Sequence, residues 1–148
     1  MRKIILPPLM LITCLIGMIA LYQFFETTPL ITSMAKNIGY LFIALGIGLP
    51  VWGAQIFKRV ETNILPYKSP DKLVTEGPFK FSRNPMYLGM LLVLIGAAVR
   101  LGVLESLYFV GLFFAVANWW YIPFEEGKMS KMFGDQFTDY KKQVRRWL

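Results

Sequence analysis

The stretch from Ile38 to Phe57 reads IGYLFIALGIGLPVWGAQIF and contains no charged residue. An α-helix rises about 1.5 Å per residue, so about 20 apolar residues cover a bilayer core of roughly 30 Å. A single segment can cross lipid only if its backbone N–H and C=O groups bond to one another within the segment, as they do in a helix. The stretch therefore predicts a transmembrane helix over residues 38–57.

Three further apolar runs flank this one, at residues 4–24, 85–102 and 104–124. Of the 148 residues, 55% are hydrophobic and the mean hydropathy is +0.48, more apolar than a soluble domain of this size needs. We expect an all-α integral membrane protein, a single domain over residues 1–148 with four transmembrane helices. The first run exceeds the apolar core of a signal peptide, about 7–15 residues, so we expect it to remain as a transmembrane helix.

The positive charges are distributed unevenly around these runs. Of the 16 Lys and Arg residues, two precede the first run, six lie within residues 58–83 and six follow Phe124. The opposite side has only Lys36 and Arg100. Because Lys and Arg gather on the cytoplasmic side, we expect both termini and the connecting loop 58–84 in the cytoplasm. Topology and attraction to anionic lipid heads explain the net charge, so we expect no nucleic-acid partner.

Two residue types restrict the chemistry. Cys14 is the only cysteine and lies in the first apolar run, so an intramolecular disulfide and a cysteine zinc cluster are excluded. The chain contains no histidine, which removes a histidine base and most transition-metal chemistry. We therefore expect no metal site.

Glycines recur at seven-residue steps in two of the expected helices. Gly39, Gly46 and Gly53 share one face of the second helix, and Gly89 and Gly96 share one face of the third. Small residues allow helix backbones to approach closely in lipid. We interpret both faces as helix-packing surfaces.

The connecting loop 58–84 is polar and cannot be one continuous helix, because it contains Pro66, Pro70 and Pro78. Its length favours a functional role. At its end, Asn84-Pro85 predicts a helix start. The asparagine side chain can accept a hydrogen bond from the N–H groups of the first turn, and proline suits the first helical position.

This helix start would place the positive end of a helix dipole beside Lys80 and Arg83. Such a position favours an anion, either a carboxylate or a phosphate. The simpler interpretation is that both side chains extend from the membrane surface into water on the cytoplasmic side, where positive residues gather. Tyr87 would then belong to an interfacial aromatic belt. The residues by themselves leave both interpretations open.

Glu125 and Glu126 close the last apolar run. In a helix, Glu125 would share a face with Tyr121 and Asn118. The pair is either solvated and paired with the basic tail, or part of a site. The tail, residues 125–148, predicts a C-terminal amphipathic helix that lies on the membrane or packs over a site, interrupted at Gly134.

Four pieces of the chain, taken in order, resemble the signature of the membrane methyltransferases that include isoprenylcysteine carboxyl methyltransferase and the phospholipid N-methyltransferases. They are Gly77-Pro78-Phe79-Lys80, Arg83-Asn84-Pro85-Met86-Tyr87-Leu88-Gly89, Glu125-Glu126, and the ending from Phe133 to Trp147. The resemblance covers roughly residues 60–148. It implies transfer of a methyl group from S-adenosylmethionine, with S-adenosylhomocysteine as product, to a lipid-borne amine or carboxylate at the cytoplasmic membrane face.

The resemblance also implies roles for individual residues. The catalytic residues would be Glu125, Arg83 and Tyr87, with Glu126 in support. The cofactor-binding residues would be Gly77, Pro78, Phe79, Lys80, Asn84, Pro85, Tyr87, Leu88, Glu125 and Glu126. Carboxylates suit the ribose hydroxyls and the cations of such a donor. The expected partners are the bilayer and, as acceptor, a membrane lipid or a lipidated small molecule.

Two positions differ from those of other family members, and the second difference favours an amine acceptor over a prenylcysteine carboxylate. Asn84 stands where other members have histidine, and Tyr121 stands where the carboxyl-methylating enzymes have arginine. Two other functions are open. One is a non-catalytic membrane interaction or scaffold protein that uses the glycine faces. The other is a small four-helix transporter, which would require an ionisable group inside the membrane, whereas Glu26, Arg100 and Glu105 lie at helix ends.

Overall fold

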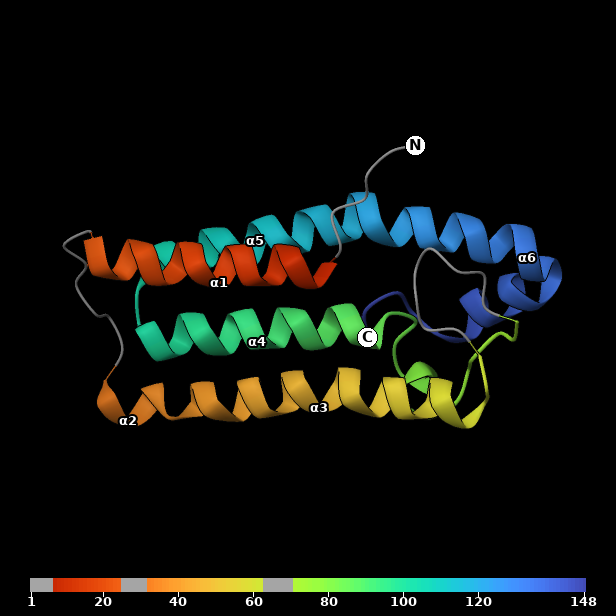
Figure 1. Cartoon of the computed structure of the whole chain (residues 1–148), viewed down its shortest axis with the longest axis horizontal. Helices are drawn as coiled ribbons and strands as arrows, with labels where there is room; N and C mark the ends of the chain where they lie inside the picture. Colours follow the sequence, from red (N-terminus) through yellow and green to blue (C-terminus); the bar gives the residue numbers. More distant parts are fainter. Residues whose placement is uncertain (1–6, 25–31, 63–70) are drawn as a thin grey trace.

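The computed structural model describes residues 7–24, 32–62 and 71–148, and within these ranges every regular element is helical. The long helices lie side by side along the long axis of the molecule (Figure 1). The all-α prediction is confirmed. Residues 4–6 of the first expected span, and Pro66 and Pro70, lie outside the described residues. In chain order the elements are α1 (Pro7–Phe24), α2 (Ser33–Lys36), α3 (Ile38–Arg59), the 3₁₀ turn η1 (Gly77–Lys80), α4 (Pro85–Leu101), the 3₁₀ turn η2 (Leu104–Ser106), α5 (Leu107–Val116), the π-helical turn η3 (Ala117–Tyr121) and α6 (Ile122–Gln143).

Three helical stretches of the described chain are long and apolar enough to cross a membrane: Pro7–Phe24, Met34–Arg59 and Leu104–Gln143. The apolar part of the last stretch ends at Phe124, and the charged part begins at Glu125. α4 is apolar but has only 17 residues. At about 1.5 Å per residue it covers about 26 Å of a core of roughly 30 Å. The helices fit an integral membrane protein, and the four-span topology stays a prediction.

Helices α3 and α4 pack through their glycines. A Cβ atom placed on Gly46 would lie 2.7 Å from the carbonyl oxygen of Gly89, and one on Gly39 would lie 2.6 Å from that of Gly96. Both distances are too short for a real side chain, so only glycine permits this approach. The predicted packing faces are confirmed, and they are used within the chain.

Helix α4 occupies the centre of the bundle and contacts α1, α3 and α5. Its buried residues join those of α1 and α5 in one apolar core, which includes Met18, Leu94 and Phe113. Tyr87, in the first turn of α4, belongs to the same core. The start of α4 is therefore enclosed by protein on several sides, which is unusual for a membrane helix end.

The last helical stretch runs from α5 through the π-helical turn into α6 without a break at Phe124. Gly134 interrupts α6, as predicted, with a backbone φ of 49° that glycine adopts readily. Beyond it, Phe137, Tyr140 and Val144 turn back and pack against Ile56, Val74 and Phe79 in a second apolar cluster. These three side chains of the tail thus contact the protein itself.

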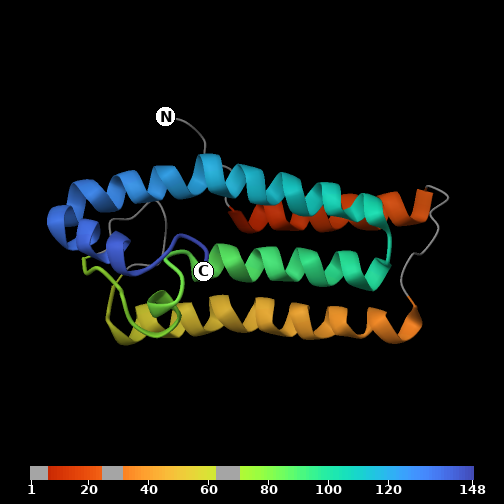
Figure 2. The same cartoon turned by 180° about the vertical axis from the view of Figure 1, so that it is seen from behind.

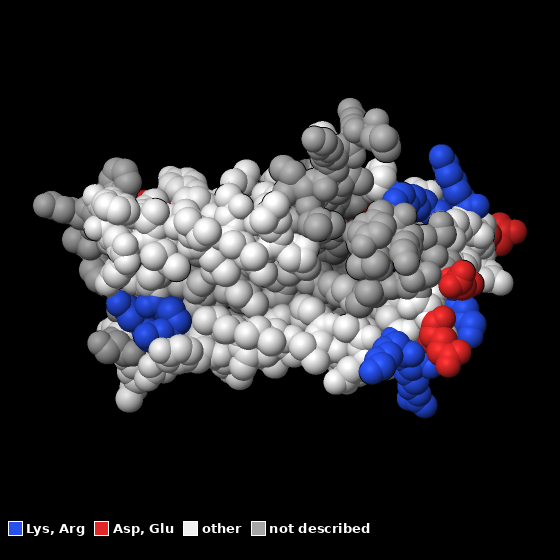
Figure 3. Space-filling view, viewed as in Figure 1, with Lys and Arg blue, Asp and Glu red and all other residues white. Residues whose placement is uncertain are grey.

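The helices alternate in direction, so the start of α1, the end of α3, the start of α4 and the kinked part of α6 lie toward one end of the molecule (Figure 1). The C-terminus lies beside the start of α4, as the reverse view also shows (Figure 2). The charged side chains coloured in Figure 3 lie toward the two ends, and the white surface between them is uncharged. This arrangement suits the expected topology, whose sidedness stays a prediction.

Candidate functional site

The start of α4 is bound by the last residues of the chain, Val144–Trp147, which we call the C-terminal strap. The backbone N–H of Arg83 donates to the carbonyl oxygen of Arg145 at 3.0 Å. The carbonyl oxygen of Arg146 accepts from Asn84 Nδ2 at 3.0 Å and from Ser82 Oγ at 3.3 Å. The strap thus covers the segment in front of α4.

The predicted helix start is correct, but the predicted cap is not. Pro85 takes the first helical position, whereas the Asn84 side chain accepts no hydrogen bond from the first turn. Its amide instead donates to the strap, because the strap presents a carbonyl oxygen beside it in a buried environment. The backbone N–H of Asn84 donates to Ser82 Oγ at 3.1 Å, so Ser82 shapes the turn before the helix.

An ion triad links the start of α4, α6 and the strap. Arg83 Nη2 lies 2.8 Å from Glu126 Oε1, and Arg146 Nη2 lies 2.7 Å from Glu126 Oε2. The Arg83 and Glu126 side chains are only 12% and 15% exposed. Burial pushes the pKa of Glu126 upward, but the hydrogen bonds and charges of Arg146 and Arg83 outweigh it and hold this pKa below its ordinary value.

Arg83 also donates from Nη1 to the carbonyl oxygens of Val144 at 2.7 Å and Lys141 at 3.2 Å. All three of its side-chain nitrogens therefore bind acceptors of the protein. Lys80, the second cation of the predicted anion site, is exposed. In this arrangement the guanidinium joins the strap and α6 to the start of α4.

Glu125 and Tyr87, both singled out from the sequence, contact each other directly. The Tyr87 hydroxyl donates to Glu125 Oε1 at 2.8 Å. The ring of Tyr87 stacks on that of Tyr121, with centroids 6.1 Å apart and planes inclined by 24°. Burial raises the pKa of Glu125, partly offset by the hydrogen bond from Tyr87 and the charge of Lys128. A half-buried carboxylate is therefore bound by one member of a stacked tyrosine pair.

The π-helical turn changes which residues share a face of the last helix. It adds about one residue to a turn, so Asn118 aligns with Glu126 and the predicted alignment of Asn118 with Glu125 is wrong. Arg146 Nη1 donates to the carbonyl oxygen of Asn118 at 3.3 Å, and Trp147 Nε1 donates to Asn118 Oδ1 at 3.1 Å. Tyr121 and Glu125 meet the same partner, Tyr87, as their spacing predicted.

The segment Gly77–Lys80 lies beside the strap end of α6. Gly77 adopts a φ of 58°, and a Cβ there would lie 2.9 Å from the Ile56 side chain. Phe79 is buried, and its carbonyl oxygen accepts from the Tyr140 hydroxyl at 2.6 Å. This segment packs in the second apolar cluster with α3 and the kinked part of α6, whereas Tyr87 belongs to the first.

The structure thus brings the sequence-predicted residues together as two direct pairs, Tyr87 with Glu125 and Arg83 with Glu126. Asn84 and Pro85 adjoin Arg83, and the half-buried Leu88 donates its backbone N–H to the carbonyl oxygen of Asn84. Pro78 and Phe79 are buried, Phe79 within the second apolar cluster, and Lys80 is exposed.

Sequence reasoning missed three residues of this region: Arg146, Tyr140 and Ser82. Ser82 and Tyr140 each bind a backbone carbonyl oxygen more than 60 positions away in the chain. The Arg146 side chain binds Glu126, 20 positions away. Charge and periodicity carry no signal for such contacts. The only available signal was the likeness of the chain's ending to the family pattern.

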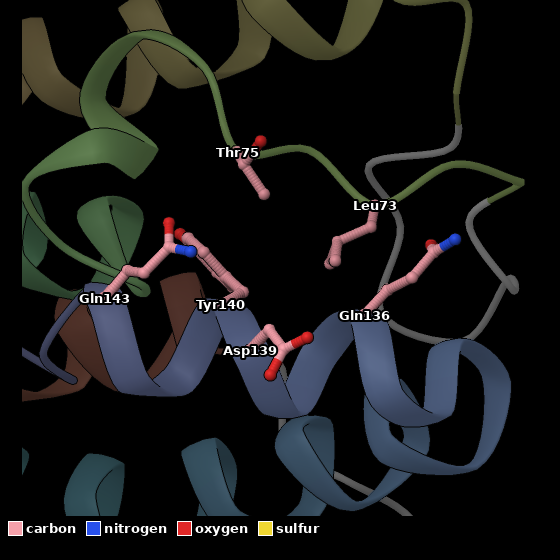
Figure 4. Close-up of a pocket in the computed structure, with 6 residues that line it drawn as sticks. All are labelled: Leu73, Thr75, Gln136, Asp139, Tyr140 and Gln143. Carbon is pink, nitrogen blue, oxygen red and sulfur yellow. The ribbon is translucent and has the colours of Figure 1, made fainter.

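A cavity of about 370 Å³ lies between α6 beyond Gly134 and the segment before η1. Figure 4 shows four side chains of α6 facing two of that segment. Its lining is mostly polar and includes none of the sequence-predicted residues, so the paired side chains described above lie elsewhere. The lining residues are Leu73, Thr75, Gln136, Asp139, Tyr140 and Gln143.

Comparison with known proteins gives a consistent result. A family described as phospholipid methyltransferase matches residues 34–136. Protein-S-isoprenylcysteine O-methyltransferases B and A of Arabidopsis thaliana are 32% and 33% identical over 115 residues, 74% of this chain and 56% of each plant protein. An uncharacterised protein of Haemophilus influenzae is 42% identical over 65 residues, 43% of this chain and all of that protein. The chain therefore spans little more than half the length of the plant relatives.

Proposed function

Because the chain belongs to the phospholipid methyltransferase family, we propose that it is an integral-membrane enzyme that transfers a methyl group from S-adenosylmethionine to a lipid-borne acceptor at the cytoplasmic membrane face. The observation that carries the proposal is the half-buried Glu125 carboxylate, bound by Tyr87 beside the ring of Tyr121. Family membership supports a methyltransferase, and the identity of donor, acceptor and membrane face belongs to the proposal.

The residues present suit this donor. S-adenosylmethionine carries a sulfonium and an ammonium cation, and a ribose whose hydroxyls donate hydrogen bonds. A carboxylate and two aromatic faces match that set of groups. We assign Glu125 to a ribose hydroxyl or a cation of the donor, with Tyr87 and Tyr121 as the aromatic neighbours. Gly77, Pro78, Phe79, Lys80, Asn84, Pro85 and Leu88 remain proposed cofactor-binding residues, and Glu126 remains in support.

When bound, the donor supplies a methyl group that its sulfonium already activates. The protein's task is then to align donor and acceptor and to exclude water. The apolar core around Tyr87 excludes water from one side of Glu125. The Tyr87 hydroxyl fixes the orientation of the carboxylate. Arg83, which we proposed as catalytic from the resemblance, would act by binding Glu126 and the strap.

The acceptor determines whether a base is needed. A carboxylate acceptor attacks directly, whereas an ammonium group must first lose a proton. Among the described side chains at this place, Glu125 suits that role, since burial raises its pKa toward the working range of a general base. Both arginines of the site bind Glu126. Because Glu126 already binds their guanidinium groups, these two arginines are not offered to a carboxylate acceptor, and we take the acceptor to be an amine.

The scaffold function loses its main support. The glycine faces that would serve as docking surfaces are filled by α3 and α4 of the same chain. The transporter function gains no support, because the described parts of the four expected spans contain charged residues only near their ends, at Arg100 and Glu105.

The experiment uses the full chain in phospholipid vesicles with S-adenosylmethionine labelled at its methyl group. One arm contains phosphatidylethanolamine as the amine acceptor, and the other contains N-acetyl-S-farnesylcysteine, whose amine is blocked, as the carboxylate acceptor. We expect label in the amine arm and a loss of about tenfold or more in Glu125→Gln, the effect of a proton-transfer or binding group. Glu105→Gln, an exposed glutamate of η2, is the matched control.

Label in the carboxylate arm alone would keep the methyltransferase and overturn the amine acceptor. Label in neither arm, from folded protein that also fails to bind S-adenosylmethionine, would contradict the proposed function.

A further inference from the structure

The Arg146 guanidinium joins two parts of the last helix that lie on either side of the π-helical turn. Its Nη1 donates to the carbonyl oxygen of Asn118 at 3.3 Å and to Asn118 Oδ1 at 3.4 Å. Its Nη2 donates to Glu126 Oε2 at 2.7 Å. Asn118 lies inside the π-helical turn, and Glu126 lies one turn beyond it. One side chain therefore spans the irregular part of the helix.

The π-helical turn sets the direction in which Glu125 points. One extra residue in a helix of about 3.6 residues per turn rotates everything after it by about 100°. If the turn relaxed to α-helix, Glu125 and Glu126 would rotate together by about that angle. The contact between Glu125 and Tyr87 thus depends on the turn staying as it is.

The two adjacent carboxylates are held at two points of the α4 start. Glu126 binds Arg83, and Glu125 binds Tyr87, four residues further along. Arg83 binds Oε1 of Glu126, whereas Arg146 binds Oε2 at 2.7 Å and also donates from Nε to Oε1 at 3.4 Å. The carbonyl oxygen of Arg146 is itself bound by Asn84 and Ser82, so the strap that carries this guanidinium is fixed to the same helix start.

We propose that Arg146 is a positioning residue: it braces the π-helical turn against Glu126 so that Glu125 meets Tyr87 in the geometry that binds the methyl donor. The inference rests on the proposed function of the Glu125 site. Arg146 itself bonds to protein groups and acts on the donor only through Glu125. A residue that merely stabilised the fold would leave donor affinity unchanged in the folded protein.

The test is a double-mutant cycle read by calorimetric binding of S-adenosylmethionine to the full chain, well below the unfolding temperature. We expect Glu125→Gln to weaken affinity about tenfold in wild type, and Arg146→Gln to weaken it by a similar factor. In the Arg146→Gln background, Glu125→Gln should then weaken the affinity for S-adenosylmethionine by less than about threefold, because the carboxylate is no longer aligned. Arg145→Gln, an exposed neighbour in the same strap, should bind as wild type does.

Arg146→Lys keeps a cation near Glu126 but loses the fork that also reaches Asn118, so we expect intermediate affinity. It replaces Arg146→Gln in the cycle if the latter fails to fold. Multiplicative effects of the two substitutions, or unchanged affinity in folded Arg146→Gln, would overturn the positioning role while the proposed function stood. Absence of binding to wild type would contradict the proposed function, and the inference with it.

Discussion

At the residue scale, the account depends on one hydrogen bond, from the Tyr87 hydroxyl to Glu125 Oε1. The bond joins two elements that are distant in the chain, and it lies where an apolar core meets the charged end of the bundle. A carboxylate held in this way is oriented before any ligand arrives. Such preorganisation is what a site for a cationic donor needs.

Tyr87→Phe removes this bond and keeps the ring. We expect weaker binding of S-adenosylmethionine by about threefold to tenfold and a loss of unfolding free energy of about 1–2 kcal/mol, because the carboxylate loses a charged hydrogen bond. Calorimetry and denaturant unfolding measure the two effects. Tyr121→Phe is the matched control, since it keeps the stacked ring and the Tyr87–Glu125 bond. Equal affinities in all three proteins would be inconsistent with the role given to Tyr87.

The Glu126 triad predicts a dependence of stability on pH. The pKa of Glu126 in the folded protein lies below its ordinary value of 4.5, so its stabilising contribution is fully present above that value and is lost as the pH falls through the lowered pKa. We expect the stability difference between wild type and Glu126→Gln to shrink on going from about pH 6 to about pH 3. Thermal unfolding of both proteins across that interval measures it. A difference that does not vary with pH would argue against the ion triad.

At the scale of elements, the sequence predicted well what depends on local pattern. Apolar length predicted the helices, glycine spacing predicted the packing faces of α3 and α4 but not that they meet each other, and Asn84-Pro85 predicted where α4 begins. These features depend on residues within a few turns of one another. The local sequence was therefore sufficient to predict these elements and their packing faces.

What could not be predicted depends on distant contacts. The Asn84 amide bonds to Arg146 because the strap lies there, and nothing near Asn84 indicates it. The π-helical turn aligns Asn118 with Glu126, which a regular helical period misplaces. Of the candidate site, the pair Tyr87–Glu125 was singled out by resemblance, whereas the bracing by Arg146 appeared only in three dimensions.

The glycine contact between α3 and α4 gives a test of packing. In Gly46→Ala the new Cβ would lie 2.7 Å from the carbonyl oxygen of Gly89, so the helices must separate. We expect a loss of about 1–3 kcal/mol in unfolding free energy. Gly48→Ala, on the same helix with no atom within 4 Å of the new Cβ, should be neutral or stabilising by up to about 1 kcal/mol. Denaturant unfolding in one detergent compares them, and equal losses would refute the close approach.

At the scale of the whole molecule, the site and the strap lie on the side of the bundle toward the end that holds most of the described basic residues (Figures 1 and 3). That end contains the residues proposed to bind donor and acceptor, and the opposite end contains Lys36 and Arg100. A lipid-borne acceptor would reach the site from the bilayer, and a water-soluble donor would reach it from the cytoplasm.

This topology predicts which positions a membrane-impermeant thiol reagent reaches on intact cells. In a Cys14→Ala background, Asn37→Cys, exposed between α2 and α3 and outside the expected spans, should be labelled. Lys72→Cys and Gln143→Cys, both exposed at the site end, should react only after the membrane is permeabilised. Labelling of Lys72→Cys on intact cells would reverse the orientation and place the site on the outer face.

The central claim is that this chain binds S-adenosylmethionine through Glu125. Calorimetry of the purified full chain, in detergent and in lipid, tests it most directly, with S-adenosylhomocysteine as the related ligand and Glu125→Gln as the variant. The account predicts binding in the micromolar range, about −8 kcal/mol, weakened about tenfold in Glu125→Gln. No binding heat from folded wild-type protein in either medium, or equal affinity in Glu125→Gln, would contradict it.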